Sequence, residues 1–380
     1  MIYLDNHSTT PVDERVLKKM LPYFSVKYNN PHSQITRHNA NIIEDIEKAR
    51  IEIAKLINSD PEEIIFTSGA TESNNLAIKG MLPKVRRGKN HFITLNTEHK
   101  CVLEALRKIE IEGAEVTILK VKKNGLIDIK EFKNSIKKET LMVSIMFANN
   151  ETGVIQPINQ IGKICKEKGI IFHTDAAQAI GKVKVNVKKM NIDMMSISSH
   201  KFYGPKGIGA IFIRKKPRIR INSLIDGGGQ EKSIRSGTLP VPLCVGFGEA
   251  AKIANKNLNL EMKKTRALRD FFLEKIRLSF PSLVINGCLK ARLPANLNIS
   301  IIGVDSELLI SKLKNTVVSS GSACSSKDIE SSSVLSGMGL SDDIVNSALR
   351  IGIGRFNSKK DILLAVEEII KVAQKIRINA

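Results

Sequence analysis

The sequence predicts an α/β protein, with a large domain built on a mostly parallel sheet and a smaller α+β domain after it. Short apolar runs alternate with helical patterns between residues 63 and 214, and this alternation ends after residue 250. Alternating strands and helices predict parallel strands with crossover helices on both faces of one sheet. A chain of 380 residues is long enough for roughly two domains.

Seven apolar runs have the length and the Ile, Val and Phe content of buried strands. In chain order they are EIIFTS (63–68), HFITLN (91–96), EVTILKV (115–121), LMVSIMF (141–147), GIIFHTD (169–175), DMMSIS (193–198) and GAIFIR (209–214). Helical patterns separate most of them, namely NIIEDIEKARIEIAKLI (41–57), TESNNLAIKGML (71–82), KCVLEALRKIE (100–110) and NQIGKICKEKG (159–169).

The residues after 250 follow a different pattern. We expect a long charged helix over 250–277, a last helix over 361–377, and between them short strands at 283–286, 296–301, 316–320 and 349–354. The predicted domains are therefore a large domain over 15–250 and a small domain formed by 1–14 and 251–380. SSKDIESSS (325–333) is polar and Ser-rich, which is typical of a mobile loop, here covering about 320–335.

The chain is strongly basic, because 59 Lys and Arg against 38 Asp and Glu give a net charge of +21. This charge raises the question of nucleic-acid binding. However, aromatic residues make up only 4% and Trp is absent, so few side chains can stack on bases. We interpret the charge as solvated faces and expect no nucleic-acid binding, with RKKPRIR (214–220) as a candidate docking face for an acidic partner.

The sequence also indicates a cellular setting. No apolar run reaches the roughly 18 residues of a membrane span, and MIYLDNHSTTP lacks the pattern of a secretory signal. Five cysteines, at 101, 165, 244, 288 and 324, are widely spaced and form no CxxC pair. We therefore expect a reducing, cytoplasmic location, with no disulfide framework, metal site or membrane anchor.

Lys201, in SSHKFYGPKG (198–207), directly follows a predicted strand and precedes a loop rich in Gly and Pro. Burial lowers the pKa of a lysine and makes it nucleophilic, as in lysines that form Schiff bases with pyridoxal phosphate. The alternative is a strand-end lysine whose amine reaches the solvent.

Asp175, in FHTDAAQ (172–178), ends another predicted strand, where open α/β sheets place their ligands. A buried carboxylate there can hold a pyridinium nitrogen protonated, and Gln178 can reach the same ring. The alternative is that Asp175 is a helix N-cap.

Three further strand ends carry suitable polar residues. In TSGATESNN (67–75) small residues lead into a helix, so free amides and the hydroxyl of Thr71 can hold a phosphate. His99 can stack on a ring or move protons, and Asn150 can donate to a ring hydroxyl. The alternatives are a structural histidine and a turn built from Asn and Gly.

Two residues near the C-terminus suit the handling of a substrate. Cys324 begins the Ser-rich stretch, where a thiol is accessible and reactive. The other four cysteines lie in helical or half-apolar contexts and are interpreted as packing residues. Arg350, in LRIGIGRF, can hold a substrate carboxylate through two hydrogen bonds, or it is an exposed strand residue.

Taken together, these segments resemble the pyridoxal-phosphate-dependent cysteine desulfurases of NifS/IscS-like type, in the class-V aminotransferase group. The resemblance runs almost end to end through motifs in the family's order: YLDNHSTTP (3–11), TSGATESNN (67–75), EHKCV (98–102), NNETGVIQP (149–157), HTDAAQ (173–178), SHKFYGPKGIGA (199–210), GGGQEKSIRSGT (227–238), SSGSACSS (319–326) and RIGIGRF (350–356).

The resemblance implies a fold and an activity. The fold is aspartate-aminotransferase-like (pyridoxal-phosphate fold type I), with a mixed, mostly parallel sheet, and it is active as a homodimer. The activity converts L-cysteine to L-alanine and transfers the sulfur to an enzyme thiol as a persulfide. The sulfur is then supplied to acceptor proteins, such as an iron–sulfur scaffold, with tRNA thiolation as a further destination.

The resemblance also implies residue roles. The catalytic residues are Lys201, which holds the cofactor and removes the substrate proton, Cys324, which takes the sulfur, and His99, which stacks on the ring. The remaining cofactor contacts are Asp175 at the ring nitrogen, Gln178 and Asn150 at the ring hydroxyl, and Thr71, Ser198, His200 and the partner subunit's Thr238 at the phosphate. Arg350 holds the substrate α-carboxylate, with Asn30 near it.

The sequence departs from the family pattern in a few places. Thr36 and Asn39 replace a usual His and Gly, Ser199 replaces a common Gly, and the chain stops at KIRINA without the longer tail that helps relatives dock the scaffold. A divergent paralogue, or a selenocysteine lyase of the same fold, is therefore an alternative. The Cys324 loop speaks against an aminotransferase, and Lys201 with Asp175 speaks against a non-catalytic sulfur carrier or scaffold.

Overall fold

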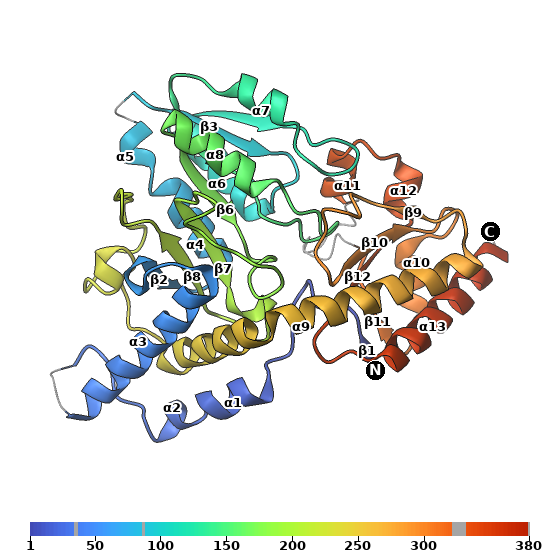
Figure 1. Ribbon diagram of the computed structural model, residues 1–380, viewed down its shortest axis with the longest axis horizontal. Coiled ribbons are helices and arrows are strands. Elements are labelled where there is room, and N and C mark those ends of the chain that lie inside the picture. The colour runs from blue at the N-terminus through green and yellow to red at the C-terminus, as the bar shows by residue number, and fades with distance from the viewer. Residues whose placement is uncertain (34–36, 86–87, 321–331, 379–380) are drawn as a thin grey trace.

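A seven-stranded sheet is the centre of the computed structural model, which describes residues 1–33, 37–85, 88–320 and 332–378 (Figure 1). The strand order is β2-β8-β7-β6-β5-β3-β4. The strands are β2 (Ile64–Thr67), β3 (His91–Leu95), β4 (Glu115–Leu119), β5 (Thr140–Ser144), β6 (Ile171–Asp175), β7 (Met194–Ser198) and β8 (Gly209–Ile213). β8 is antiparallel to β2 and β7, and the other neighbours are parallel. The seven predicted strands and the mixed, mostly parallel sheet are confirmed.

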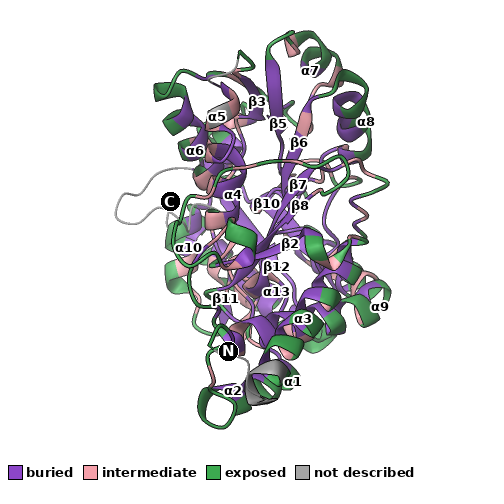
Figure 2. Ribbon diagram, turned by 90° about the vertical axis from the view of Figure 1, so that its left-hand side faces the viewer, coloured by how far each residue is buried: buried purple, intermediate pink, exposed green. Residues whose placement is uncertain are grey.

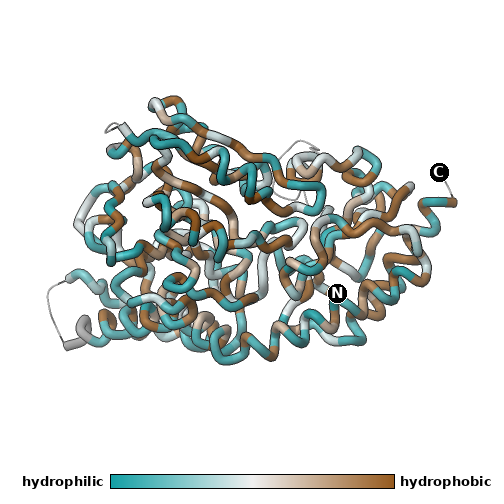
Figure 3. The backbone as a smooth tube through the Cα atoms, turned by 45° about the horizontal axis from the view of Figure 1, so that its top comes forward, coloured by the Kyte–Doolittle hydropathy of each residue, from teal (hydrophilic) through white to brown (hydrophobic). Residues whose placement is uncertain are grey.

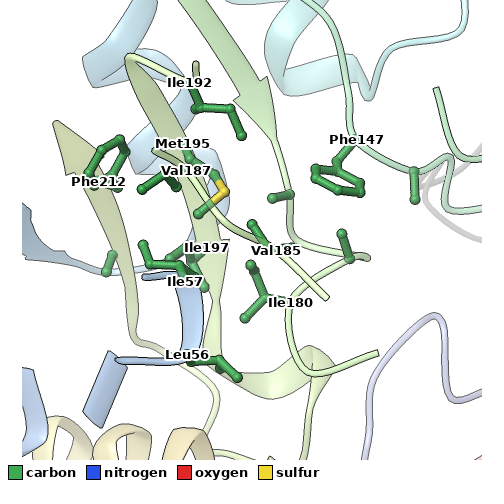
Figure 4. Close-up of a cluster of buried hydrophobic side chains, with 14 of the residues drawn as sticks. Leu56, Ile57, Phe147, Ile180, Val185, Val187, Ile192, Met195, Ile197 and Phe212 are labelled. Atoms are coloured by element: carbon green, nitrogen blue, oxygen red, sulfur yellow. The ribbon is translucent and has the colours of Figure 1, made fainter. Parts of the chain in front are cut away.

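Helices cover both faces of this sheet, so that its inner strands are buried between them, while the edge strand β4 stays partly exposed (Figure 2). On one face, α4 (Ala70–Lys79), α5 (Leu82–Val85) and α6 (Lys100–Ile111) enclose a core that includes Ile65. On the other, α3 (Arg37–Ile57), α8 (Ile158–Lys168) and the start of α9 (Val241–Ser279) enclose a core that includes Phe66 and Phe212. Figure 4 shows part of this second core. Neighbouring residues of one strand serve different cores because side chains alternate between the faces.

One predicted helix is divided in two. The pattern over 71–82 predicts a single helix, but Gly80 ends α4 and a separate short α5 follows. The backbone of Asn222 crosses at this point and donates to the carbonyl of Gly80 (3.0 Å). A Cβ at position 80 would lie 2.9 Å from the carbonyl oxygen of Asn222, so only glycine allows this crossing.

The remaining elements of the large part are short. They are α1 (Glu14–Met20), α2 (Pro22–Ser25), α7 (Ile129–Ser135) and the single turns η1 (Pro61–Glu63), η2 (Ser199–Lys201) and η3 (Glu231–Ser233).

The C-terminal part forms its own core. β10 (Asn296–Ser300) is the centre of a three-stranded antiparallel sheet with β9 (Val284–Ile285) and β12 (Ala348–Gly352), and β1 (Ile2–Tyr3) pairs in parallel with β11 (Thr316–Val317). The helices of this part are α10 (Ser306–Lys312), α11 (Ser333–Gly337), α12 (Asp342–Asn346) and α13 (Lys359–Ile378). β11 has only two residues, so the strand predicted over 316–320 is shorter than expected.

α9 runs through both parts of the molecule (Figure 1). Its 39 residues correspond to a length of about 58 Å. Ala254 belongs to the large core and Leu268 to the small one. The predicted boundary at residue 250 therefore falls inside one helix, and we keep the two domains as a proposal in which α9 is shared. Among the described residues, no helix is both long and apolar enough to cross a membrane.

A buried ion pair fastens the 226–239 loop to the sheet. Arg50 of α3 donates to both carboxylate oxygens of Glu231 (2.8 Å each), and the amide of Phe66 in β2 donates to the same carboxylate (2.6 Å). Both charged side chains are less than a tenth exposed. Three successive residues from Glu231 to Ser233 have positive φ, a conformation that residues other than glycine rarely adopt. The ion pair therefore holds a strained backbone in place.

We predict that Glu231→Gln destabilises the protein by about 3–5 kcal/mol, because it leaves the buried charge of Arg50 without its partner. The measurement is the free energy of unfolding from a urea titration. Glu47→Gln is the matched control, since Glu47 also pairs with Arg50 but is half exposed, and it should cost less than about 1 kcal/mol. Equal, small effects of the two changes would contradict the assignment.

Candidate active site

A cavity of about 340 Å³ lies at the carboxyl ends of the parallel strands. β2, β3, β5, β6 and β7 all end at this edge, since β8 is the antiparallel strand of the sheet. Open α/β sheets bind their ligands at this edge. Nine of the residues predicted for the site line the cavity: Thr71, His99, Asn150, Asp175, Gln178, Ser198, His200, Lys201 and Arg350.

The amine of Lys201 is directed by the N-terminal segment. Lys201 lies in η2, immediately after β7, and its Nζ donates to the backbone oxygens of His7 (3.0 Å) and Ser8 (2.6 Å). Thr10 is fastened to the same loop, because its amide and its hydroxyl both donate to the carbonyl of His200 (3.0 Å each). The predicted strand-end lysine is therefore turned into the cavity and not toward solvent.

Asp175 is a buried carboxylate with two neutral donors. Asn74 of α4 donates from Nδ2 to Oδ2 (2.7 Å), and the amide of Ala177 donates to Oδ1 (2.9 Å). The bond to Ala177 resembles the predicted cap, but residues 177–181 form turns and no regular helix. Neutral donors orient a carboxylate without neutralising its charge, so Asp175 can pair with a cationic ring nitrogen.

The N-terminus of α4 forms an anion cradle beside Lys201. Gly69 is the N-cap, and no side chain caps the helix. Ser68, Gly69, Ala70 and Thr71 line the cavity, so the first amides of the helix and its dipole are available to a phosphate. No atom lies within 4 Å of the Cβ position at Gly69, which has φ +153°, so the cradle is open on this side.

A polar cluster lies behind Lys201. Gln178 donates to the carbonyl of His7 (2.8 Å) and accepts from Nζ of Lys182 (2.7 Å) and from Nδ1 of His7 (3.1 Å). Burial and the charges of Lys201 and Arg350 hold the pKa of Lys182 well below its usual value. Burial and nearby cations, Lys182 first, also lower the pKa of His7. Gln178 is therefore fixed by contacts on both ends of its amide.

Two histidines, His99 and His200, face the cavity. His99 is the N-cap of α6, and its Nδ1 accepts the amide proton of Cys101 (3.2 Å), so a neutral ring carries its proton on Nε2. Burial, followed by the charges of Lys201, Lys206 and Lys182, lowers the pKa of His200 to about 4. A neutral His200 donates to an anion from one nitrogen while the other contacts Thr9 (3.0 Å).

Arg350 is held by groups from two distant segments. Its Nη2 donates to Asp5 (2.8 Å), its Nη1 donates to the carbonyl of Asn150 (3.3 Å), and its Nε has no hydrogen-bond partner in the described part of the chain. The side chain is 2% exposed and lines the cavity. Such a guanidinium is oriented and still has donor capacity for a carboxylate.

Two buried acids, Glu98 and Glu151, lie near the cavity. Burial raises the pKa of Glu98 well above its usual value, although the amide of Met146 donates to it (2.7 Å). Burial also raises the pKa of Glu151 to about 7, opposed by a hydrogen bond from Ser332 and the charge of Arg350.

Not every predicted residue lies at the cavity. Asn30 is exposed, and its Oδ1 accepts the amide proton of His32 (2.9 Å). Thr238 is also exposed and does not line the cavity of its own chain. Cys324 and Thr36 fall outside the described residues, and the side chain of Asn39 does so too. Their roles stay predictions.

The sequence-based reasoning missed several residues at the site. His7, Ser8, Cys101 and Lys206 line the cavity, and Asn74 supports Asp175. Cys101 packs against the core beneath α6, as predicted, but its thiol also lies at the cavity against Asn74 and His99. Its position in the first turn of α6 was the available signal. Cys165 and Cys244 are buried, as predicted.

The chain is similar to known proteins over nearly its whole length. The aminotransferase class-V family model matches residues 2–364. Cysteine desulfurase IscS of Rickettsia peacockii (strain Rustic) is 50% identical over 376 residues, which cover 99% of this chain and 92% of that protein. A solved NifS-like protein superposes with a TM-score of 0.92 at 34% identity, covering 98% of this chain and 99% of that one. The solved structure of SspA in complex with cysteine superposes with a TM-score of 0.83 at 37% identity, covering 94% of this chain and 100% of that one.

We predict that Glu151→Gln gains stability relative to the wild type as the pH rises. The folded-state pKa of about 7 exceeds the usual 4.5, so the folded protein retains a proton that the unfolded chain releases. The stabilisation that Glu151 contributes is therefore fully present below about pH 4.5 and is lost as the pH rises to about 7. Urea titrations should show a relative change of roughly 1–3 kcal/mol between about pH 5 and pH 8.

Glu167→Gln is the control for this experiment, since Glu167 is an exposed glutamate on α8. Its stability relative to the wild type should stay constant over the same pH range. A constant difference for Glu151→Gln as well would show that Glu151 titrates as an ordinary surface carboxylate.

Proposed function

Because this chain belongs to the class-V aminotransferases and to the cysteine desulfurases within that family, we propose that its cavity is where L-cysteine loses its sulfur. The enzyme depends on pyridoxal phosphate and converts L-cysteine to L-alanine. The observation that carries the assignment to this cavity is the convergence of Lys201, Asp175, the uncapped α4 N-terminus and Arg350 on one space of about 340 Å³.

The residues present fit the cofactor at each of its functional ends. The open cradle at Gly69, with Thr71, Ser198 and His200 around it, suits a phosphate. Asp175 suits the ring nitrogen, and Lys201 suits the carbonyl. When bound, pyridoxal phosphate supplies an electrophilic carbonyl carbon and a ring that stabilises negative charge at the substrate Cα.

The chain's own groups then orient the substrate and move its proton. Arg350 binds the α-carboxylate, while Asp5 and the carbonyl of Asn150 keep its guanidinium in one orientation. Lys201 Nζ takes the proton from the substrate Cα, and the carbonyls of His7 and Ser8 keep this amine close to its point of action. The ring of His99, which lines the cavity, would stack on the cofactor ring.

We assign the sulfur-accepting thiol to Cys324. Its thiolate attacks the substrate sulfur, so that the substrate Cβ–S bond breaks and an S–S bond forms. The proton held at Lys201 and the proton released from the Cys324 thiol are delivered to Cα and Cβ of the carbon skeleton, which leaves as alanine, and Cys324 keeps the sulfur as a persulfide. One cysteine and one thiol thus give one alanine and one persulfide, with no external oxidant.

The wider setting of the enzyme follows from the resemblance. We propose a cytoplasmic homodimer in which Thr238 of the partner subunit completes the phosphate site, which agrees with the exposure of Thr238 within its own chain. The persulfide sulfur then goes to an acceptor such as an iron–sulfur scaffold protein or a tRNA-thiolation relay.

The first test asks which thiol takes the sulfur. We predict that Cys324→Ser keeps the visible absorbance of bound pyridoxal phosphate but abolishes sulfide release with cysteine and a reductant, and that mass spectrometry finds no persulfide. Cys101→Ser is the matched control, since Cys101 is the described cavity thiol, and it should retain turnover. Full activity of Cys324→Ser would show that another thiol accepts the sulfur. Failure of the wild-type protein to bind pyridoxal phosphate would refute the proposed function itself.

The second test concerns the substrate carboxylate. We predict that Arg350→Lys raises KM for cysteine about tenfold or more, with a smaller loss of kcat, because an ammonium cannot match the planar guanidinium. Steady-state alanine formation gives both constants. Asp5→Asn should cause a smaller rise in KM, since it loosens Arg350 without removing it. An unchanged KM for Arg350→Lys would place the carboxylate elsewhere.

A further inference from the structure

A second, larger hollow lies far from the cavity, on the small domain. It is a groove of about 870 Å³ between α10 and α13, with the N-terminal strand β1 at one edge. Figure 1 shows α10 and α13 side by side. No residue lines both this groove and the cavity. The groove therefore has no part in the chemistry described above.

One face of α13 forms the length of the groove. The lining residues of this helix are Leu364, Glu367, Glu368, Lys371, Val372, Lys375 and Ile376. Their spacing of three and four residues places them on one side of the helix. From Leu364 to Ile376 this face extends over about 18 Å, or three turns. Hydrophilic and hydrophobic residues alternate along the helix accordingly (Figure 3).

The floor of the groove is apolar. Leu308 and Leu364 are large side chains that remain 43% and 44% exposed. Ile2, Val372 and Ile376 complete the floor and pack against the small-domain core. Exposed leucines in a concave surface are typical of a site that a partner covers.

The rim of the groove is cationic. Lys312 and Lys314 lie on one side and Lys371 and Lys375 on the other, and all four are exposed. In the part of the chain that the structure describes, none of their amines forms a hydrogen bond or an ion pair. Two acids, Glu367 and Glu368, also line the groove. The carboxylate of Glu368 is engaged within the protein, because it accepts hydrogen bonds from the amides of Lys314 (2.8 Å) and Asn315 (3.1 Å).

We propose that this groove binds an acidic amphipathic helix of a partner protein. Such a helix lays apolar residues at i, i+3, i+4 and i+7 into a hydrophobic groove, and the length of the α13 face matches about three turns. Its carboxylates pair with the four lysines, which increases the rate of association and selects the partner. The lysines are spread over two elements instead of converging on one point, which suits a helix better than a single anionic head group.

The charge of the chain argues against a second copy as the occupant. With a net charge of +21, another copy would bring more positive charge to a rim that already has four lysines without partners. The exposed leucines of the floor argue against nucleic acid, which offers no apolar side chains to cover them.

The test uses the full-length holoenzyme and a fluorescein-labelled helical peptide of about 16 residues, with Leu at i, i+3, i+4 and i+7 and Glu on both flanks. Fluorescence anisotropy should show saturable binding with a Kd on the order of 10 µM that weakens as salt is added. A scrambled peptide of the same composition should bind at least about tenfold more weakly. Equal binding of both peptides, or none, would overturn the proposal.

The matched variants are Lys371→Glu with Lys375→Glu in the groove, and Lys130→Glu with Lys133→Glu on α7, which changes the net charge equally. The first pair, and separately Leu364→Asp, should weaken peptide binding about tenfold, whereas the second pair should not. Alanine formation from cysteine should be unchanged in all of them, so the outcome is independent of the proposed function. Binding of anionic lipid vesicles or RNA in preference to the peptide, with the same sensitivity to the groove variants, would instead identify the groove as a site for those ligands.

Discussion

The fastening of the N-terminal segment between the two cores is the constraint on which the cavity depends. β1 is paired with β11 in the small part, and seven residues after the end of β1 the same segment is bonded, through Thr10, to the loop that carries Lys201. Asp5, between these points, holds Arg350. Lys201, the proposed proton carrier, and Arg350, the proposed ligand of the carboxylate, are therefore positioned by one short stretch of backbone, and a shift of this stretch displaces both.

Burial determines the electrostatics of the cavity wall. It lowers the pKa of His7, His200 and Lys182 and raises the pKa of Glu98, and in each case the neutral form is favoured. Among the charged groups that remain, Arg350 is paired with Asp5 and Asp175 is oriented by two neutral donors. A wall of mostly neutral, hydrogen-bonded groups allows a few placed charges to act strongly on a small zwitterionic substrate, because little else competes with them.

The sequence was sufficient to predict the seven strands and the residues that follow them, because an apolar run and the strand end after it are recognised from consecutive residues. Asp175 and Lys201 were found in this way. His7, Asn74 and Cys101 were not, since their roles depend on contacts between segments far apart in the chain. The split at Gly80 also escaped prediction, because it depends on the crossing of Asn222. The roles of Asn30 and Thr238 rest on the resemblance alone, and that of Cys324 rests on the resemblance and on its Ser-rich context.

The large core contains Val334, Leu335 and Val345 beside residues of the first strands, although these three belong to a late segment of the chain. During synthesis the N-terminal parts leave the ribosome long before their last packing partners exist. The large core is therefore completed only after nearly the whole polypeptide has emerged. Long-range closure of this kind slows folding and leaves part of the apolar surface of the nascent chain open to aggregation.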